Sequence, residues 1–203
     1  MLDLSTIVFN TTSDDDSGKI SDMTISKEGI AELGSYEGCI LTPYLDSVGV
    51  KTIGFGATKS DIADLDDWSW DKEITLQQAA DYLVLHVRKY MYAVNTALKV
   101  DVNQHQFDAL VSFVYNLGVG IVRGSLFQAV NSGASADEIT DCFMKYVYAG
   151  GNELQGLVNR RRAEAALYNT GVYKSRGMVE LNTTYSNHEE RSTGKTINLL
   201  SYI

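Results

Sequence analysis

The apolar and polar positions in the first third of the chain change from a helical pattern to a β-strand pattern. Between residues 26 and 36, apolar side chains recur at the spacing of one helix face, and Ser26 stands where a helix N-cap belongs. Gly38 follows as a helix stop signal. Two β-prone runs, 41–46 and 50–56, then flank a turn sequence. The pattern predicts a short helix and then a β-hairpin, with the chain's single proline at its entrance, where an edge strand tolerates it.

The remainder of the chain up to residue 170 is dominated by helical periodicity. After an acidic loop at 61–73, Thr75 and Gln78 have the spacing of a capping box, and apolar positions keep a helical period from there to about Lys99. A helix of that length can connect two lobes. Further helical segments, separated by glycine-rich joints, are predicted at 104–117, 125–131, 136–146 and 158–168. We therefore expect an α+β fold, in which a long helix joins a small N-terminal lobe with a hairpin to a helical C-terminal lobe.

Both ends of the chain differ in composition from the part between them. Residues 1–23 combine aspartates with serine and threonine and predict a polar extension, within which residues 2–9 could dock as a strand. The stretch 183–195 is as polar as a disordered tail, so its own lobe or neighbouring chains would have to hold it. The expected organisation is an extension at 1–23, a domain at 24–173 with lobes at about 24–75 and 98–173 joined by a helix at about 76–97, and an extension at 174–203.

Composition and charge narrow the classes of function. With 44% hydrophobic and 21% charged residues, the composition is that of an ordinary globular protein, and the formal net charge of −9 argues against nucleic acid as the main partner.

Cys39 and Cys142 are far apart in sequence and are expected to be reduced and buried. Neither the cysteines nor the histidines have the spacing of metal ligands, so we expect no metal and no cofactor. We also expect no export signal, because the N-terminus has no positively charged segment and only a four-residue apolar run. We expect no membrane span or signal anchor, because no segment approaches the roughly 18 apolar residues required.

Three polar residues of the predicted helix and hairpin have a spacing that suggests chemistry. Glu37 ends the helix, Asp46 stands at the turn and Thr52 lies in the returning strand, in the pattern E-x8-D-x5-T. By itself this pattern is weak, because a Glu near a helix end is usually solvated and an Asp in this context is usually a turn former. The sequence around the three residues decides between these interpretations.

Three sequence blocks supply that context. The first combines residues 36–38 with 44–56, the second is 106–118, and the third combines 148–151 with 156–164, which holds three consecutive arginines. In this order the blocks resemble those of the phage-type lysozymes, glycoside hydrolase family 24, over roughly residues 26–170. The resemblance implies a lysozyme-like fold with a glycan in the cleft between two lobes. It also implies hydrolysis of the β-1,4 bond between N-acetylmuramic acid and N-acetylglucosamine in bacterial peptidoglycan.

The resemblance assigns catalytic roles that the chemistry of glycoside hydrolysis explains. One carboxyl group must be protonated to donate to the leaving oxygen, and one carboxylate must be ionised. Packing where the helix meets the hairpin is expected to desolvate Glu37 and raise its pKa, which makes it the acid, whereas Asp46 at a turn stays solvated and ionised. The resemblance implies an inverting reaction, in which Asp46 and the Thr52 hydroxyl position the attacking water. The two carboxyl groups should then lie about 6.5–9.5 Å apart.

Further site residues carry over from the family, each with an alternative. Asn116 matches a polar position where an amide contacts an N-acetyl sugar, and the alternative is a helix C-cap. Tyr146 matches an aromatic residue near the cleft floor, and the alternative is core packing. One of the three consecutive arginines should reach the catalytic glutamate, and Arg160 is the closest match by spacing. Such a cation favours the ionised form of Glu37. The other two arginines are expected to be solvated or paired with acidic surface.

One position departs from the family pattern. Many members read Gly-x-Gly-His-Thr after the catalytic threonine, whereas this chain has Ala57 at the histidine position. An imidazole, and any ion pair that it makes, is therefore missing. Because that histidine is usually a stabilising group, we expect activity to survive and stability to need another source.

A lysozyme of this kind would serve bacterial lysis by a phage in one of two ways. It is either an endolysin that waits in the host cytoplasm for release through a holin, or a component of the virion tail or baseplate whose extensions contact neighbouring proteins. The negative net charge suits delivery by a particle. The alternative from a different class is a non-catalytic peptidoglycan-binding or structural virion protein with a retained lysozyme fold, although all three catalytic positions are present.

Overall fold

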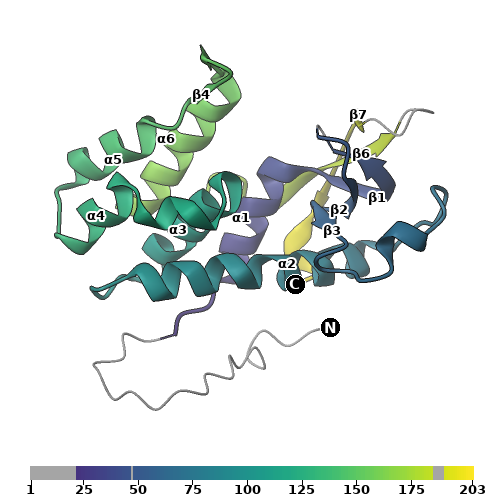
Figure 1. Ribbon diagram of the computed structural model, residues 1–203, viewed down its shortest axis with the longest axis horizontal. Helices are drawn as coiled ribbons and strands as arrows, with labels where there is room; N and C mark the ends of the chain where they lie inside the picture. Colours follow the sequence, from purple (N-terminus) through teal and green to yellow (C-terminus); the bar gives the residue numbers. More distant parts are fainter. Residues whose placement is uncertain (1–21, 47, 185–189) are drawn as a thin grey trace. The chain divides into compact units, whose positions relative to one another are not determined.

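The structure of the chain, a computed structural model, describes residues 22–46, 48–184 and 190–203 (Figure 1). The predicted strand at 2–9 lies outside the described residues. The helices are α1 (Lys27–Glu37), α2 (Leu76–Ala97), α3 (Gln104–Leu117), α4 (Ser125–Asn131), α5 (Ala136–Met144) and α6 (Gln155–Thr170), with short 3-10 turns η2 (Leu65–Asp67), η3 (Val119–Arg123) and η4 (Leu199–Ser201). The strands are β1 (Cys39–Leu45), β2 (Lys51–Gly54), β3 (Ala57–Thr58), β4 (Tyr148–Ala149), β5 (Asn152–Glu153), β6 (Met178–Thr184) and β7 (Glu190–Asn198).

The described residues divide into two compact units. The sheet unit consists of residues 30–88 and 175–203, and the helical unit consists of residues 22–29 and 89–174. Helices α1 and α2 each contribute residues to both units. The combination of a sheet with a set of helices confirms the predicted α+β class. The C-terminal extension belongs to the unit that holds the hairpin.

The sheet unit is built on a five-stranded sheet with the order β3-β2-β1-β6-β7. Strands β1 and β2 form the predicted antiparallel hairpin. The prediction that the proline-containing strand lies at an edge is wrong, because β1 lies between β2 and β6. Pro43 is tolerated there since the register of β1 with β2 is irregular between Ile40 and Tyr44, while β6 pairs only with Cys39 and Ile40. The missing N–H of the proline therefore falls at a break in the ladder.

The C-terminal extension supplies strands β6 and β7, whose ribbons are the green-yellow arrows of Figure 1. Strand β6 pairs in parallel with β1 and antiparallel with β7. The stretch 183–195, where it is described, is therefore held by strands of its own unit, which is one of the two possibilities given by the sequence. Val179 and Leu199 are buried, whereas the side chains of residues 192–196 are exposed. Backbone pairing and two apolar anchors hold a stretch whose composition is that of a tail.

Helix α1 begins and packs as its sequence predicts. The Ser26 side chain accepts a hydrogen bond from the N–H of Gly29 at 2.9 Å, which confirms its role as N-cap. Ile30 and Leu33 on the apolar face are buried. At Gly34, a Cβ atom would lie 2.8 Å from the Leu199 side chain, so the absence of a side chain lets the helix approach the C-terminal segment closely. The end of α1 is thereby fixed within the sheet unit.

The N-terminus of α2 has the predicted capping box. The Thr75 hydroxyl accepts from the N–H of Gln78 at 3.1 Å, and the Gln78 side chain accepts from the N–H of Thr75 at 2.9 Å.

No helix of the described residues is both long and apolar enough to cross a membrane.

The helical unit follows the predicted segments closely. Helices α3 and α4 have the predicted limits, α5 ends two residues earlier than predicted, and α6 extends beyond the prediction at both ends. The core of this unit is rich in buried phenylalanines: Phe107, Phe113, Phe127 and Phe143. Cys142 in this unit and Cys39 in the sheet unit are free and buried, as expected, and burial raises the pKa of the Cys39 thiol to about 12.

Candidate active site

Glu37 stands at the junction between α1 and the hairpin. It is the last residue of the helix and is half-buried. Gly38, with a φ of 67°, turns the chain so that β1 begins at the next residue, Cys39. The carboxyl group is therefore carried by a helix end that continues directly into the strand leading to Asp46.

A buried carboxylate that the sequence analysis missed fixes this helix end. Glu32 is 3% exposed and accepts hydrogen bonds from the Tyr36 hydroxyl at 2.8 Å and from the N–H of Ser175 at 2.7 Å. These bonds tie the last turn of α1 to the C-terminal extension and so hold the backbone that carries Glu37. The spacing of four residues between Glu32 and Tyr36 is a signal that could have revealed the first bond.

Asp46 follows β1 and organises the hairpin turn. Its Oδ1 accepts from the N–H groups of Val48 at 2.9 Å and Val50 at 2.8 Å. Its own N–H donates to the Val50 carbonyl, and its carbonyl accepts from the N–H of Gly49, whose φ of 83° favours glycine. Among the described residues no hydrogen bond to Oδ2 is found. One carboxylate oxygen of Asp46 therefore builds the turn.

Thr52 lies on β2 and is connected to Asp46 through Val50. The threonine is 2% exposed, and its hydroxyl donates to the Val50 carbonyl at 2.9 Å. The same carbonyl accepts from the N–H of Asp46 at 3.0 Å. Because the hydroxyl proton is used in this bond, the Thr52 oxygen can still accept a hydrogen bond from a water molecule. The structure thus brings Asp46 and Thr52 into one hydrogen-bonded hairpin.

The helical unit contains a buried ion-pair network between α3 and α6. Glu164 is 1% exposed and accepts from the Ser112 hydroxyl at 2.7 Å, from Arg160 Nε at 3.1 Å and from Arg161 Nη2 at 3.1 Å. Arg161 Nε also lies 2.8 Å from the second carboxylate oxygen. Burial raises the pKa of the Glu164 carboxyl, and the two guanidinium groups oppose that shift. The two arginines thereby belong to the core of this unit.

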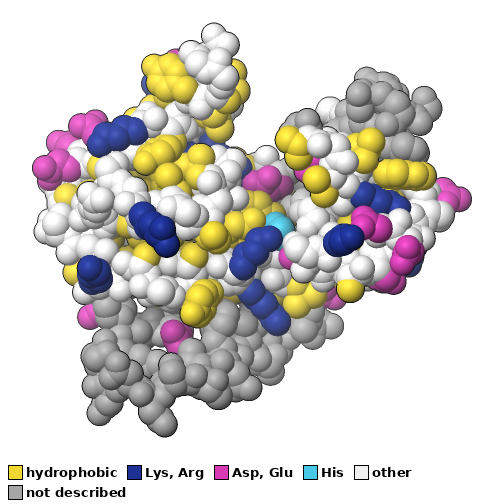
Figure 2. Space-filling view, viewed as in Figure 1, with side chains coloured by type: hydrophobic (Ala, Val, Ile, Leu, Met, Phe, Trp, Pro, Cys, Tyr) yellow, Lys and Arg dark blue, Asp and Glu magenta, His cyan; other side chains and the backbone are white. Residues whose placement is uncertain are grey.

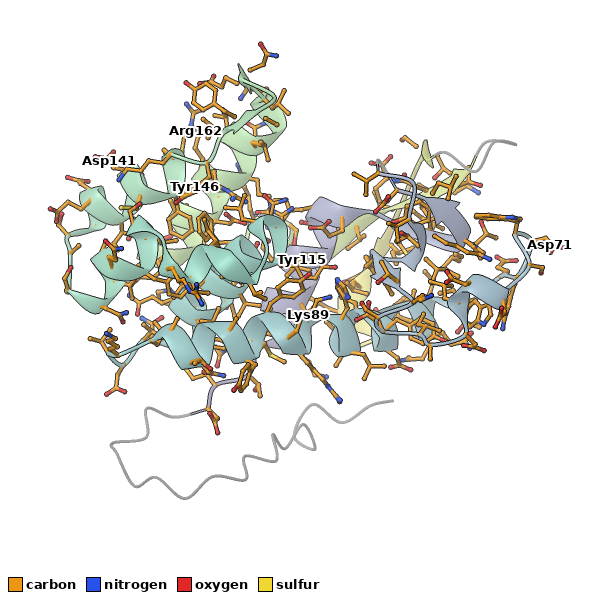
Figure 3. The ribbon with its side chains drawn as sticks, in the orientation of Figure 1. Asp71, Lys89, Tyr115, Asp141, Tyr146 and Arg162 are labelled. Carbon is orange, nitrogen blue, oxygen red and sulfur yellow. The ribbon has the colours of Figure 1, made fainter. Side chains whose placement is uncertain are left out.

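This network corrects one prediction about the arginine run. Arg161 is 0% exposed, so the prediction that it is solvated or paired with acidic surface is wrong. Arg162, labelled in Figure 3, is exposed as predicted. The spacings of Arg160 and Arg161 from Glu164, four and three residues, place all three side chains on one helix face, a signal that the sequence analysis did not use. The contact between Arg160 and Glu37 stays a prediction.

Asn116 is attached to the same network. It is half-buried, and its side-chain oxygen accepts from Arg161 Nη2 at 3.0 Å. Helix α3 is capped by Gly118, whose N–H donates to the Val114 carbonyl, so the alternative role of Asn116 as the C-cap is wrong. With its oxygen held by Arg161, the amide presents its two N–H groups as donors for a ligand acceptor. Sugar binding by Asn116 stays a prediction.

Tyr146 packs partly into the helical core. Its ring meets that of Phe113 edge to face, with centroids 5.2 Å apart, and Figure 3 shows it among the helices of this unit. The side chain is half-buried, and its hydroxyl lies 3.0 Å from where a Cβ of Gly124 would stand. One side of the Tyr146 ring is therefore packed against the core, which was the alternative to substrate binding. A contact between Tyr146 and the substrate stays a prediction.

The described residues contain no group of three or more His, Cys, Asp or Glu side chains placed to hold a metal ion.

The comparisons with known proteins identify the family. The profile described as "Phage lysozyme" matches residues 34–164, a stretch that contains the helix end, the hairpin, α3 and the arginine run. The chain belongs to the phage lysozyme family. Within the family, the endolysin of Bacillus phage PZA is 43% identical over 156 residues, which cover 75% of this chain and 58% of that protein. The chain therefore spans little more than half the length of this relative.

Solved structures of similar proteins confirm the lysozyme-like fold. An endolysin from Escherichia coli O157:H7 phage FAHEc1 is 34% identical with a TM-score of 0.66, and the match covers 75% of this chain and 97% of that chain. The muramidase domain of SpmX from Asticaccaulis excentricus is 27% identical with a TM-score of 0.63, covering 72% of this chain and 98% of that chain.

Proposed function

We propose that the chain is a lysozyme, a glycoside hydrolase that degrades bacterial peptidoglycan. The observation that carries the proposal is the placement of Glu37, Asp46 and Thr52 along one helix-to-hairpin segment of the sheet unit, inside the stretch that matches the phage lysozyme family. The names of the similar proteins, two endolysins and a muramidase domain, support the same activity.

Each of the three residues has a role that its surroundings support. Glu37, half-buried at the helix end, protonates the oxygen of the leaving sugar. Asp46 is oriented by two backbone N–H groups on Oδ1 and uses Oδ2 to take a proton from the attacking water. The Thr52 oxygen accepts a hydrogen bond from that water. A single displacement by water inverts the configuration at the anomeric carbon.

The bond cleaved is the β-1,4 bond between N-acetylmuramic acid and N-acetylglucosamine. The similarity to a protein named as a muramidase domain supports this choice. Asn116 binds an N-acetyl group through its amide, Tyr146 lines the glycan site, and Arg160 supports Glu37. No cofactor or metal takes part in the mechanism.

The biological role is that of an endolysin, which degrades the wall of the host from within after release through a holin. Relatives named as endolysins support this role. The C-terminal extension pairs with strands of its own unit, so it needs no tail or baseplate protein to hold it. A virion-associated lysozyme is the alternative, and detection of the chain in purified, nuclease-treated particles would favour it.

Release of soluble fragments from purified peptidoglycan tests the activity. Glu37→Gln should reduce the rate by about 10²-fold or more, because general acid catalysis contributes roughly 10²–10⁴. Glu28→Gln is the matched control, since Glu28 lies on the same helix but is exposed, and it should leave the rate unchanged. A folded wild type that binds peptidoglycan without releasing fragments would instead indicate the non-catalytic alternative.

A further inference from the structure

The sheet unit has a groove between the hairpin and the loop that connects β3 to α2. None of the proposed catalytic residues Glu37, Asp46 and Thr52 lines it. Its volume is about 690 Å³, within the roughly 300–1,000 Å³ of small-ligand sites. One wall comes from the hairpin, with Leu45, Val50 and Lys51, and the other comes from the loop between β3 and α2, with Trp68 and Trp70. Both tryptophans of the sequence therefore line this groove.

Lys51, which lines the groove, and the proposed catalytic Thr52 are neighbours on β2. Leu45 and Lys51 are paired across the two strands and both line the groove. Successive residues of a strand point to opposite faces, so the Lys51 side chain and the buried Thr52 side chain lie on different sides of the hairpin. Val50 joins the two regions, because it lines the groove and is hydrogen-bonded to Asp46. The groove is thus a second site beside the proposed catalytic one.

Trp70 forms an exposed aromatic platform that is held in place. Its side chain is 38% exposed, and Lys51 Nζ lies 4.6 Å from its ring centroid. The same ammonium donates to the carbonyls of Asp66, at 3.1 Å, and Trp68, which anchors it to the loop. Trp68 is in turn covered by Lys72, 3.6 Å from its ring centroid. A ligand that stacks on Trp70 meets a ring already positioned, which lowers the entropic cost of binding.

The charges around the groove favour a neutral ligand. Lys59 is paired with Asp66 at 2.8 Å, and the loop 61–73 carries six acidic residues against one lysine. Figure 2 shows hydrophobic, basic and acidic side chains interleaved over the part of the sheet unit that holds β2 and this loop. A polyanion would be repelled by the loop. A polymer with apolar ring faces and peripheral hydroxyl groups fits an aromatic platform with a mixed polar rim.

The geometry points to a second glycan-binding site, in which Trp70 stacks on a sugar ring of a β-1,4-linked N-acetylated glycan. This inference rests on the proposed function, since the glycan is the strand of the insoluble substrate. Ser60 and the Lys59–Asp66 pair at the rim supply hydrogen bonds to hydroxyl and N-acetyl groups. Binding here retains the enzyme on the wall and raises its effective concentration at the strands it cleaves.

Tryptophan fluorescence reports on this site directly, because no tryptophan lies elsewhere in the sequence. Glu37→Gln protein, which prevents hydrolysis, is titrated with the β-1,4-linked hexamer of N-acetylglucosamine. We expect a saturable change in emission that is retained in the Trp68→Phe variant and lost in the Trp70→Phe variant. Absence of a saturable change in protein whose wild type degrades peptidoglycan would overturn the inference while leaving the proposed function intact.

Binding to the wall supplies the second measurement. In the Glu37→Gln background, Trp70→Ala should lower the fraction pelleted with teichoic-acid-free sacculi at least threefold. Tyr92→Ala, which removes a comparably exposed aromatic side chain from α2, should not. With Glu37 intact, Trp70→Ala should slow the degradation of sacculi but leave hydrolysis of short soluble muropeptides unchanged. Equal pelleting of the Trp70 and Tyr92 variants, or a change in oligomeric state alone, would contradict a glycan site. Trp70-dependent pelleting without hydrolysis by the wild type would sink the proposed function and leave the site standing.

Discussion

His86 on α2 and Asp61 in the loop after β3 form a buried hydrogen-bonded pair, with Nδ1 2.6 Å from Oδ2 and both side chains 8% exposed. The same Asp61 oxygen accepts from the N–H of Thr58 at 3.0 Å. The pair therefore ties α2 to the end of β3, next to Ala57, where many family members have histidine. An imidazole is present in this region after all, but it comes from the long helix instead of the strand. We expect this pair to be the other source of stability that the absence of the family histidine requires.

Loss of this pair should destabilise the protein measurably. His86→Ala leaves the buried Asp61 carboxylate without its imidazole partner, and we expect the free energy of unfolding to fall by about 3 kcal/mol. Urea unfolding at neutral pH measures the change. Adding Asp61→Asn should restore part of the loss, because the uncompensated charge is then removed. A change below about 0.5 kcal/mol, the range of ordinary surface substitutions, would show that the pair contributes little.

Asp108 should make stability depend on pH. This buried carboxyl group of α3 accepts hydrogen bonds from Ser26, from Gln104 at 2.8 Å and from Tyr173 at 2.7 Å. It therefore connects the segment before α1 with the segment after α6. Burial raises its pKa above the ordinary 3.8 despite these donors. The folded state therefore binds the proton more tightly than the unfolded state. The stability gained from protonating Asp108 in the folded state is fully present below the pKa of the unfolded chain. It is lost as the pH rises through the higher pKa of the folded state.

The Asp108→Asn variant isolates this effect, since an amide cannot titrate. The stability of the wild type relative to the variant should rise when the pH is lowered from 7 toward 4. Denaturant unfolding of both proteins at several pH values measures the difference. A difference that stays constant, or that falls on acidification, would contradict the raised pKa.

Disrupting the buried ion-pair network on α6 should destabilise the protein, and an exposed arginine on the same helix provides the control. Glu164→Ala removes the partner of two buried guanidinium groups and should cost roughly 3–5 kcal/mol of stability. Arg162→Ala, on the same helix but exposed, should change stability by no more than about 0.5 kcal/mol. Thermal unfolding of the two variants in parallel provides the comparison, and similar melting temperatures would argue against a structural role for the network.

Substitutions of Thr52 can distinguish a structural role of its hydroxyl group from a role in catalysis. Thr52→Ser keeps the hydroxyl group that donates to the Val50 carbonyl and is expected to retain most of the activity. Thr52→Val keeps the shape but removes the oxygen that positions water, and should reduce the rate on peptidoglycan by about 10²-fold, a value at the lower end of effects on proton transfer. Unfolding curves of both variants show whether loss of the buried hydrogen bond to Val50 is responsible. Full activity of the valine variant would exclude the proposed role.

The parts of the fold that depend on local sequence were predictable. Ser26, Thr75 and Gly38 mark helix ends through hydrogen bonds and φ values that involve only near neighbours, and the structure places those ends accordingly. The hairpin was also predictable, because the Asp46 turn is built from bonds within five residues.

Features that depend on distant partners were not predictable. The parallel pairing of Cys39 with Leu181 joins segments more than 140 residues apart, and nothing in the polar sequence of β6 and β7 indicates it. The burial of Arg161 depends on α3 covering α6, although the spacing to Glu164 hinted at a pair. His86 was likewise unremarkable in the sequence, because its partner Asp61 lies in a loop whose path the pattern does not determine.

Analysis of the released fragments tests whether Glu37 is the acid of a muramidase. Purified peptidoglycan is digested with the wild type, with Glu37→Gln and with Glu28→Gln, and the released fragments are analysed by mass spectrometry. We predict muropeptides with reducing N-acetylmuramic acid ends from the wild type and the Glu28 variant, and a yield lower by about 10²-fold or more from the Glu37 variant. Intact glycan strands after digestion with folded wild type, or equal cleavage by the Glu37 variant, would contradict the account.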